Sequence, residues 1–157
     1  MKIRKAESKD IGRLLDLLSQ VLEIHAKLRP DLFIPGTTKY SHEELECMIN
    51  EENRRIYVAV DKTDTVMGYA FCEIKPRLSR NNLVPFTSFY IDDLCVDERF
   101  RGHHVGQALF EHVCSHAKDL GCYEISLNVW EGNDPARKFY EAVGFKVKST
   151  TMEYILQ

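Results

Sequence analysis

The sequence predicts an α/β or α+β domain that is built on a mixed β-sheet. Segments with apolar residues at helical spacing alternate along the chain with segments rich in β-branched and aromatic residues. Polar turns with Gly, Pro, Asp or Thr separate the two kinds of segment. The length of 157 residues fits one domain over 1–157. These local patterns indicate the element types but not the order of the strands.

The amino-terminal half is predicted to contain a strand, two helices and a β-hairpin. Apolar residues at helical spacing follow Ser8, and His25 lies on their buried face. Ser41-His-Glu-Glu44 is a capping box that opens the second helix. A polar turn at 62–65 separates two β-rich runs, which is typical of an antiparallel hairpin. The predicted elements are 2–6, 11–25, 41–52, 55–61 and 66–75.

The carboxy-terminal half is predicted to alternate strands with helices. Gly121 stands at the usual position after the end of a helix that covers 105–120. A shorter helix has Pro135 in its first turn and Gly144 after its last residue. The β-rich runs are 86–96, 123–130, 145–149 and 152–156, and the last two are predicted to close the sheet.

The chain from Tyr90 to Phe110 has the features of an anion-binding turn. A strand ending at Val96 is followed by a turn and a helix start with the sequence Arg101-Gly102-His103-His104-Val105-Gly106-Gln107. Free N–H groups and the helix dipole attract anions at a helix start, glycines permit close approach, and an arginine can bind phosphate. The plain alternative is a helix start with two convenient glycines. The turn is neither a Walker loop nor a GxGxxG turn.

A second segment lies on the next predicted helix, with the sequence Asn133-Asp-Pro-Ala136-Arg-Lys-Phe139-Tyr140-Glu-Ala-Val-Gly144-Phe145. Together the two segments closely resemble motifs A and B of the GNAT acetyltransferase superfamily, R-G-x-G-x-G and N-x-x-A-x-x-F-Y-x-x-x-G-F. The resemblance is detailed from Tyr57 to Phe145 and topological before that. It departs at one position, because the middle glycine of motif A is His104 here.

The resemblance implies the GNAT fold, with a mixed sheet of six to seven strands and helices on both faces. It also implies that acetyl-CoA binds where two parallel strands splay apart. The implied cofactor-binding residues are Leu94, Cys95, Val96, Arg101, Gly102, His103, His104, Val105, Gly106, Gln107, Asn133, Ala136 and Tyr140. The effect of His104 is open: a helical position tolerates a side chain, a site of close pyrophosphate approach does not, and a protonated imidazole can bind phosphate.

The resemblance further implies an N-acetyltransferase that moves the acetyl group to a primary amine of a small molecule or protein by direct attack. Tyr140 is placed to protonate the departing thiolate, and a backbone N–H near Leu94 or Cys95 to polarise the acetyl carbonyl. An ammonium must first lose a proton, and Asp92 and Asp93 are the candidate bases. Because side chains alternate across a strand, only one should face the acceptor. Asp92 is preferred, with a water chain as the alternative.

Composition excludes several other classes of function. The net charge of −3 with scattered basic residues argues against nucleic-acid binding, and no apolar stretch approaches a membrane span. The amino terminus has no apolar run of a signal peptide. Five cysteines without CxxC spacing predict neither a disulfide framework nor a zinc ribbon and fit a cytoplasmic setting. No metal is predicted, because His112 and His116 have no third ligand.

The acceptor is expected to bind between two variable stretches, 28–42 and 76–86, which offer Arg29, Phe33, Tyr40, Arg77 and Arg80. A homodimer is an open alternative to a monomer. A second hypothesis for the whole chain is a non-catalytic or weakly catalytic acyl-CoA sensor, in which His104 marks weakened catalysis. Consumption of acetyl-CoA in the presence of amines would separate the enzyme from the sensor.

Overall fold

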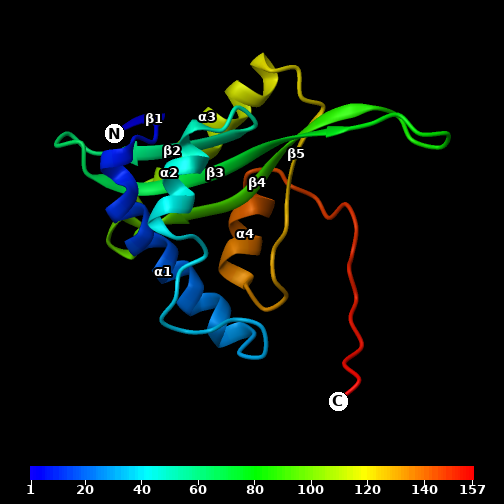
Figure 1. Ribbon diagram of the computed structural model, residues 1–157, viewed down its shortest axis with the longest axis horizontal. Helices are drawn as coiled ribbons and strands as arrows, with labels where there is room; N and C mark the ends of the chain where they lie inside the picture. The colour runs from blue at the N-terminus through cyan, green and yellow to red at the C-terminus, as the bar shows by residue number, and fades with distance from the viewer.

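The computed structural model of residues 1–157 contains one mixed sheet of five strands in the order β1-β2-β3-β4-β5 (Figure 1). The first four strands are antiparallel, and β5 runs parallel to β4. The strands are β1 (Lys2–Lys5), β2 (Arg54–Val60), β3 (Val66–Arg77), β4 (Phe86–Val96) and β5 (Glu124–Leu127). The helices are α1 (Ile11–Leu28), α2 (His42–Asn50), α3 (Val105–Asp119) and α4 (Asp134–Ala142), with short 3-10 turns at Ser8–Asp10 and Glu98–Phe100.

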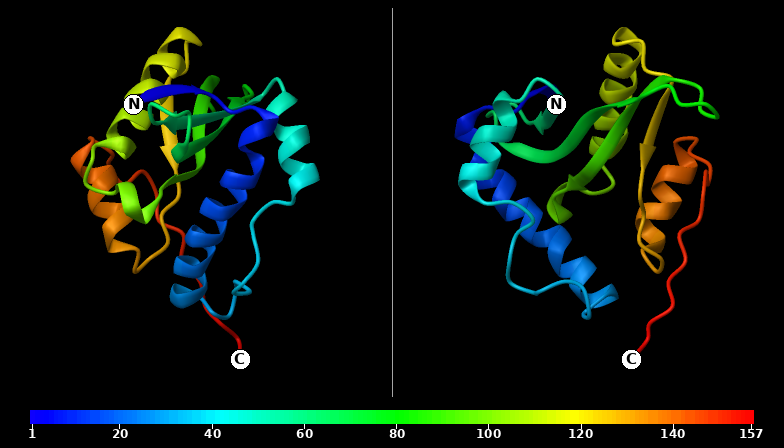
Figure 2. Two further views of the ribbon diagram at one scale, coloured as in Figure 1. Left: turned by 90° about the vertical axis from the view of Figure 1, so that its left-hand side faces the viewer. Right: turned by 45° about the vertical axis from the view of Figure 1, so that its right-hand side comes forward.

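Helices cover both faces of the sheet, as Figure 2 shows, with α1 and α2 on one side and α3 and α4 on the other. Alternate residues of β2 face opposite layers: Val58 packs with α1 and α2, whereas Tyr57 packs against α3. Leu14 and Leu109 are fully buried, one in each layer. Burying a leucine of this kind contributes about 1.5–3 kcal/mol. The predicted fold class, with helices on both faces of a mixed sheet, is confirmed.

The strands β4 and β5 are paired over only part of their course. Ser88 to Ile91 pair with Glu124 to Leu127, and there the parallel ladder ends. Beyond Ile91, β4 continues to Val96 with β3 as its only partner, while the chain after Leu127 turns toward α4. The two strands therefore diverge, as the family resemblance implied, and leave one edge of β4 without a neighbour.

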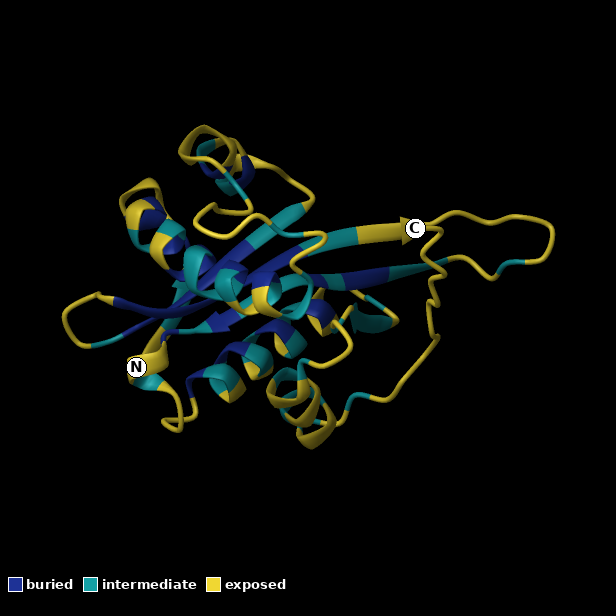
Figure 3. Ribbon diagram, turned by 90° about the horizontal axis from the view of Figure 1, so that it is seen from below, coloured by how far each residue is buried: buried dark blue, intermediate teal, exposed yellow.

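The predicted closing strands at 145–149 and 152–156 do not form, so the sheet has five strands rather than six to seven. Phe145 is the last partly buried residue, and residues 146–157 are all exposed. The segment leaves the body of the molecule, and its end lies apart from every strand (Figures 1 and 2). Its backbone is coloured as exposed in Figure 3. Alternating apolar residues make a strand only where another backbone edge accepts their hydrogen bonds, and this chain brings none to them. None of the helices combines the length and apolar content needed to cross a membrane.

Candidate active site

A cleft of about 1300 Å³ opens where β4 and β5 diverge. Its walls come from α1, β4, the turn between β4 and α3, the start of α3, the loop after β5, and α4. Most of its lining is apolar. The volume exceeds the range of about 300–1000 Å³ that is usual for small-molecule sites, so the cleft can hold two substrates together.

One end of the cleft is the amino terminus of α3. No side chain caps this helix, so the N–H groups of Val105, Gly106 and Gln107 remain available to a ligand. Arg101 and Gly102 lie beside them on the cleft wall. The structure thus brings the predicted phosphate turn to the cleft, except for His103, which does not line it.

His104 is the N-cap of α3 and has a left-handed backbone, with φ of 60°. It is therefore not helical, and the side chain stands where the family glycine would adopt this conformation without strain. The left-handed region costs a residue with a side chain about 1–2 kcal/mol. Gly106 has a different role, because a Cβ there would approach the ring of Phe139 to 3.3 Å. The second glycine thus allows α3 to contact α4 closely.

The turn before α3 is held by a buried carboxylate that the sequence did not single out. Asp97 is fully buried and pairs with Arg13 of α1 and with Arg99, whose Nη2 lies 2.8 Å from the carboxylate. Its side chain also accepts the backbone N–H of Arg99 at 2.9 Å. Asp97 therefore fixes the phosphate turn to α1. Its position directly after a strand and before an arginine-rich turn was the only signal in the sequence.

Asp92 and Asp93 both line the cleft, contrary to the expectation that they point to opposite faces. The reason is a β-bulge in β4: Phe71 of β3 pairs with Asp93, and the next residue, Cys72, pairs with Ile91. Asp92 is the extra residue, so the regular alternation of side chains breaks at this point. A strand pattern in the sequence does not reveal a bulge, because the bulge depends on the neighbouring strand.

The two aspartates lie in different electrostatic surroundings. Asp92 accepts hydrogen bonds from the Tyr40 hydroxyl at 2.5 Å and from Lys39 Nζ at 2.9 Å. Burial raises the pKa of Asp92, but these two hydrogen bonds outweigh it and hold the pKa below its ordinary value. Asp93 accepts a hydrogen bond from the Tyr69 hydroxyl at 3.1 Å. Burial raises the pKa of Asp93 to about 6.

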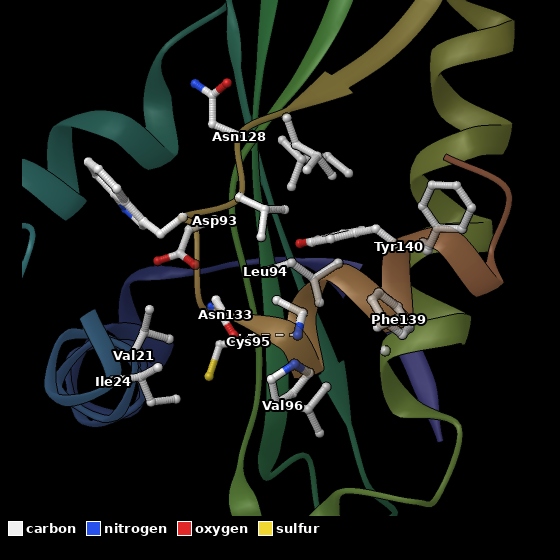
Figure 4. A pocket seen from close by; sticks show the side chains of 18 of the residues that line it. Val21, Ile24, Asp93, Leu94, Cys95, Val96, Asn128, Asn133, Phe139 and Tyr140 are labelled. Carbon is white, nitrogen blue, oxygen red and sulfur yellow. Dashed lines mark hydrogen bonds between the residues drawn. The ribbon is translucent and has the colours of Figure 1, made fainter. Parts of the chain in front are cut away.

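α4 carries two of the predicted site residues: Asn133 is its N-cap, and Tyr140 lies in its body. Asn133 caps the helix, because its side-chain oxygen accepts the N–H of Ala136 at 3.4 Å, drawn as a dashed line in Figure 4. Tyr140 packs edge-on against Phe139 and Phe145, and its hydroxyl points into the cleft on the side of Asp93 (Figure 4). Burial, reinforced by the charge of Asp93, raises the pKa of Tyr140, so the phenol keeps its proton at neutral pH.

The other end of the cleft is aromatic. His25 and Phe33 have ring centroids 5.2 Å apart, and Phe33 meets Trp130 edge-on at 5.4 Å. Burial, with a smaller effect of Lys39, lowers the pKa of His25. His25 thus lines the cleft, where the sequence predicted a packed side chain. Trp130 is the last residue of the predicted strand 123–130, a position that could have marked it.

The two stretches expected to hold the acceptor behave differently. Residues Leu28, Phe33 and Lys39 of the first stretch line the cleft. No residue of 76–86 does, because the β3–β4 hairpin extends beyond the rest of the sheet (Figure 1) and carries Arg77 and Arg80 away. No group of three or more histidine, cysteine, aspartate or glutamate side chains is placed to hold a metal ion.

Comparison with known proteins identifies the family to which this chain belongs. Residues 20–145 match the profile described as the Acetyltransferase (GNAT) family. Glucosamine 6-phosphate N-acetyltransferase of Arabidopsis thaliana is 30% identical over 155 residues, covering 96% of this chain and 93% of that protein. A crystal structure of glucosamine-6-phosphate N-acetyltransferase from Arabidopsis thaliana has a TM-score of 0.71 at 26% identity, covering 99% of this chain and 98% of that one.

A crystal structure of a mutant of the BH1408 protein from Bacillus halodurans has a TM-score of 0.96 at 30% identity and covers 100% of both chains. The matched residues run from the second half of α1 to Phe145 and include all the cleft-lining residues except Leu18. The protein described here belongs to the acetyltransferase (GNAT) family and is an acetyl-CoA-dependent N-acetyltransferase.

Proposed function

We propose that the cleft binds acetyl-CoA along β4 and the start of α3 and acetylates a primary amine, with Asp93 as general base and Tyr140 as general acid. The observation that supports this most is that a carboxylate with a raised pKa and a protonated phenol face one cleft at the point where β4 loses its neighbour. A base and an acid on opposite sides of a reacting centre are what amide formation from a thioester needs.

The residues present fit acetyl-CoA. The open edge of β4 beyond Ile91 offers backbone N–H and C=O groups to the amides of the pantetheine arm, with Leu94, Cys95 and Val96 on the cleft wall. The uncapped start of α3 and Arg101 suit the pyrophosphate. Asn133 and Ala136 line the path of the arm. Acetyl-CoA would supply the acyl group as a thioester.

Asp93 replaces Asp92 as the preferred base. The Asp92 carboxylate is already paired with Lys39 and Tyr40, and its lowered pKa makes it a weak proton acceptor. Asp93 has a pKa of about 6, so it is ionised at neutral pH and is still basic enough to accept a proton from an ammonium group, directly or through water. Asp92 then serves to hold Lys39 and Tyr40 at the acceptor side of the cleft.

A pair of matched variants tests the assignment. Asp93→Asn should lower kcat/KM by about 100-fold or more and remove the acidic limb of the pH profile, which in the unaltered enzyme should rise as the pH increases through about 6. Asp92→Asn should keep that limb. If Asp92→Asn removes the limb and Asp93→Asn keeps it, the assignment is wrong. Acetyl-CoA affinity, measured by calorimetry, should stay close to that of the unaltered enzyme in both.

The acceptor is a primary amine, and two acidic side chains beside an aromatic wall favour a cationic one. A panel of amino sugars and their phosphates, amino acids, polyamines and lysine peptides should identify it through release of free CoA. Glucosamine 6-phosphate belongs in this panel, because it is the substrate named for the Arabidopsis relative. Binding of acetyl-CoA without release of CoA by any amine would favour the sensor hypothesis instead.

We further propose that the protein is a homodimer. Two features of the chain support this: the exposed carboxy-terminal segment, which pairs with no strand, and the free edge of β5, which has no neighbouring strand on that side. Light scattering at micromolar concentration should give twice the monomer mass of 18.2 kDa. The mass of a single chain would contradict the proposal.

A further inference from the structure

The cleft extends from one helical layer to the other, because it opens where the sheet divides between β4 and β5. The start of α3 and the residues of α4 that are proposed to bind acetyl-CoA form one side, and α1 forms the other. In Figure 4, Val21 and Ile24 of α1 lie on one side of Asp93 and Leu94, and Tyr140 lies on the opposite side. With acetyl-CoA on the side of α3 and α4, the acceptor is left with the side of α1.

The acceptor side is lined by apolar and aromatic side chains. Six residues, which we name the acceptor pocket, line the cleft there: Val21, Ile24, His25 and Leu28 of α1, with Phe33 and Trp130. The loop after β5 closes this end against α1, because a Cβ added at Gly132 would lie 3.3 Å from Cδ2 of Leu28. Ile24 and Trp130 are 37% and 39% exposed, so part of their apolar surface is open to a ligand.

The acceptor pocket has few polar atoms. Its side chains offer only the ring nitrogens of His25 and the indole N–H of Trp130 for hydrogen bonds. The hydroxyl groups of a sugar would lie against Ile24, Leu28 and Phe33 without partners. A polar group that loses its hydrogen bonds to water on binding reduces affinity. An alkyl or aryl body has no such groups and gains from the same surface.

No free cation lies at the acceptor side. Only two lysine or arginine side chains line the cleft, and one of them, Arg101, lies at the start of α3, beyond the acceptor side. The other, Lys39, places its Nζ 2.9 Å from the Asp92 carboxylate. Both acidic side chains at the centre of the cleft, Asp92 and Asp93, attract an ammonium and repel an anion. A phosphate or carboxylate on the acceptor would therefore have to take Lys39 away from Asp92.

Arg29 also lies close to this side, with its guanidinium 5.9 Å from the centre of the Trp130 ring. It does not line the cleft, and its nitrogens are paired at 2.6 Å with Asp31 and at 2.6 Å with Glu153. Two carboxylates already compensate its charge. Arg29 is thus occupied within its own chain and leaves no anchor for an anionic acceptor.

We propose that the acceptor is a primary amine with an apolar alkyl or aryl body and no anionic group, held in the acceptor pocket with its amine toward Asp93. The inference rests on the proposed acetyl transfer and names its substrate class. It distinguishes this chain from its Arabidopsis relative, because glucosamine 6-phosphate, named for that protein, carries a phosphate and sugar hydroxyls. The acceptor pocket offers a partner to neither kind of group.

The transfer balances with such an amine. One proton of the ammonium goes to Asp93, and the free amine nitrogen then forms a bond to the acetyl carbon. The carbon–sulfur bond breaks, and the thiolate leaves with its electron pair and takes the proton of Tyr140. The second proton of the nitrogen returns to the Tyr140 oxygen, which leaves an amide and free CoA. The apolar body takes no part in these steps and sets only how well the amine is held.

A series of unbranched primary amines tests the substrate class on the unaltered enzyme. Propylamine, butylamine, pentylamine and hexylamine have nearly the same basicity, so chain length changes mainly the contact with the acceptor pocket. We expect kcat/KM to rise about fourfold with each added methylene. Glucosamine 6-phosphate should react with a kcat/KM at least about 100-fold below that of hexylamine. A kcat/KM that does not change along the series, or a higher value for glucosamine 6-phosphate, would overturn the proposal.

Two matched substitutions locate the apolar contact. Ile24→Asn should lower kcat/KM for hexylamine by about tenfold, should affect propylamine less, and should leave the acetyl-CoA dissociation constant unchanged. The control is Ile34→Asn, since Ile34 is 72% exposed in the loop after α1 and does not line the cleft. It should keep kcat/KM for hexylamine within about twofold. Equal losses in the two variants, or none in Ile24→Asn, would contradict the assignment of the pocket.

The same measurements separate this inference from the proposed acetyl transfer. If hexylamine is not acetylated while an amino sugar, amino acid, polyamine or lysine peptide is, the substrate class is wrong and the acetyl transfer stands. If acetyl-CoA binds but no amine releases CoA, the proposed acetyl transfer fails, and the substrate class fails with it.

Discussion

Residues 1–117 and residues 118–157 differ in how they are stabilised. The first region closes two cores around four strands and three helices, with side chains such as Leu17 and Phe89 fully buried. The second region has a strand and a helix of its own but no buried residue. The cleft lies at their boundary, so the rigid region positions one wall and the weakly packed region supplies the other. Acetyl-CoA bound in the cleft as proposed would contact both regions.

The proposed catalytic pair, Asp93 and Tyr140, spans this boundary. Asp93 is fixed in β4 by the ladder to β3 and by Tyr69, inside the rigid region. Tyr140 is carried by α4, which touches the rigid region through the contact of Phe139 with Gly106. The distance between base and acid is therefore set by how α4 rests on α3. Contacts that hold the second region in place should matter for the rate as well as for stability.

The largest expected effect is on the free energy of unfolding. Leu17→Ala in α1 should cost about 2–5 kcal/mol, because the side chain is fully buried and its removal leaves a cavity. Leu127→Ala in β5 should cost about 1 kcal/mol, since its side chain is only partly buried. Urea unfolding at one protein concentration, without acetyl-CoA, measures both. Equal losses would mean that the two regions are equally well packed.

A second prediction concerns the rate. Tyr140→Phe should lower kcat by about 100-fold while the acetyl-CoA dissociation constant changes little, because only the acidic proton is lost. Phe139→Leu, on the same helix, should instead weaken acetyl-CoA binding and stability, since it alters the contact with Gly106. Steady-state kinetics with calorimetry separates the two. A parallel loss of affinity in Tyr140→Phe would assign the residue a structural role.

Acetyl-CoA should stabilise the second region more than the first. At a concentration 100 times its dissociation constant, it should raise the free energy of unfolding by about 2.7 kcal/mol. Hydrogen exchange should slow most in α4 and in the loop after β5, which line the cleft and have no buried side chains. If β2 and β3 gain the most protection, acetyl-CoA does not stabilise the second region preferentially, and this prediction is wrong.

The smallest effect concerns the left-handed residue at the start of α3. His104→Gly should stabilise the protein by about 0.5–1 kcal/mol, because glycine adopts a φ of 60° without strain, although it costs more entropy on folding. His103→Gly is the control, since His103 has no positive φ, and it should destabilise by about 0.5–1 kcal/mol. Thermal unfolding measures both. Stabilisation by His103→Gly would show that local strain at His104 is not the cause.

The sequence was sufficient wherever the deciding contacts are local. The capping box at Ser41, the proline in the first turn of α4 and the Asn133 cap are interactions between residues a few positions apart, so their spacing predicts them. The same holds for the turn from Arg101 to Gln107. Through the family resemblance that they carry, these segments predicted the position of the cleft and gave Tyr140, Asp92 and Asp93 as candidate catalytic residues.

Only the tertiary structure decided what depends on a neighbouring strand or helix. The bulge that turns both aspartates toward the cleft arises from pairing with β3, and the unequal pKa values of Asp92 and Asp93 arise from Lys39, Tyr40 and burial. The alternation at 152–156 predicted a strand, but in the structure this segment pairs with no strand of the sheet. Side-chain spacing along a chain encodes helix starts and buried faces, whereas strand pairing and burial are set by residues far away in the sequence.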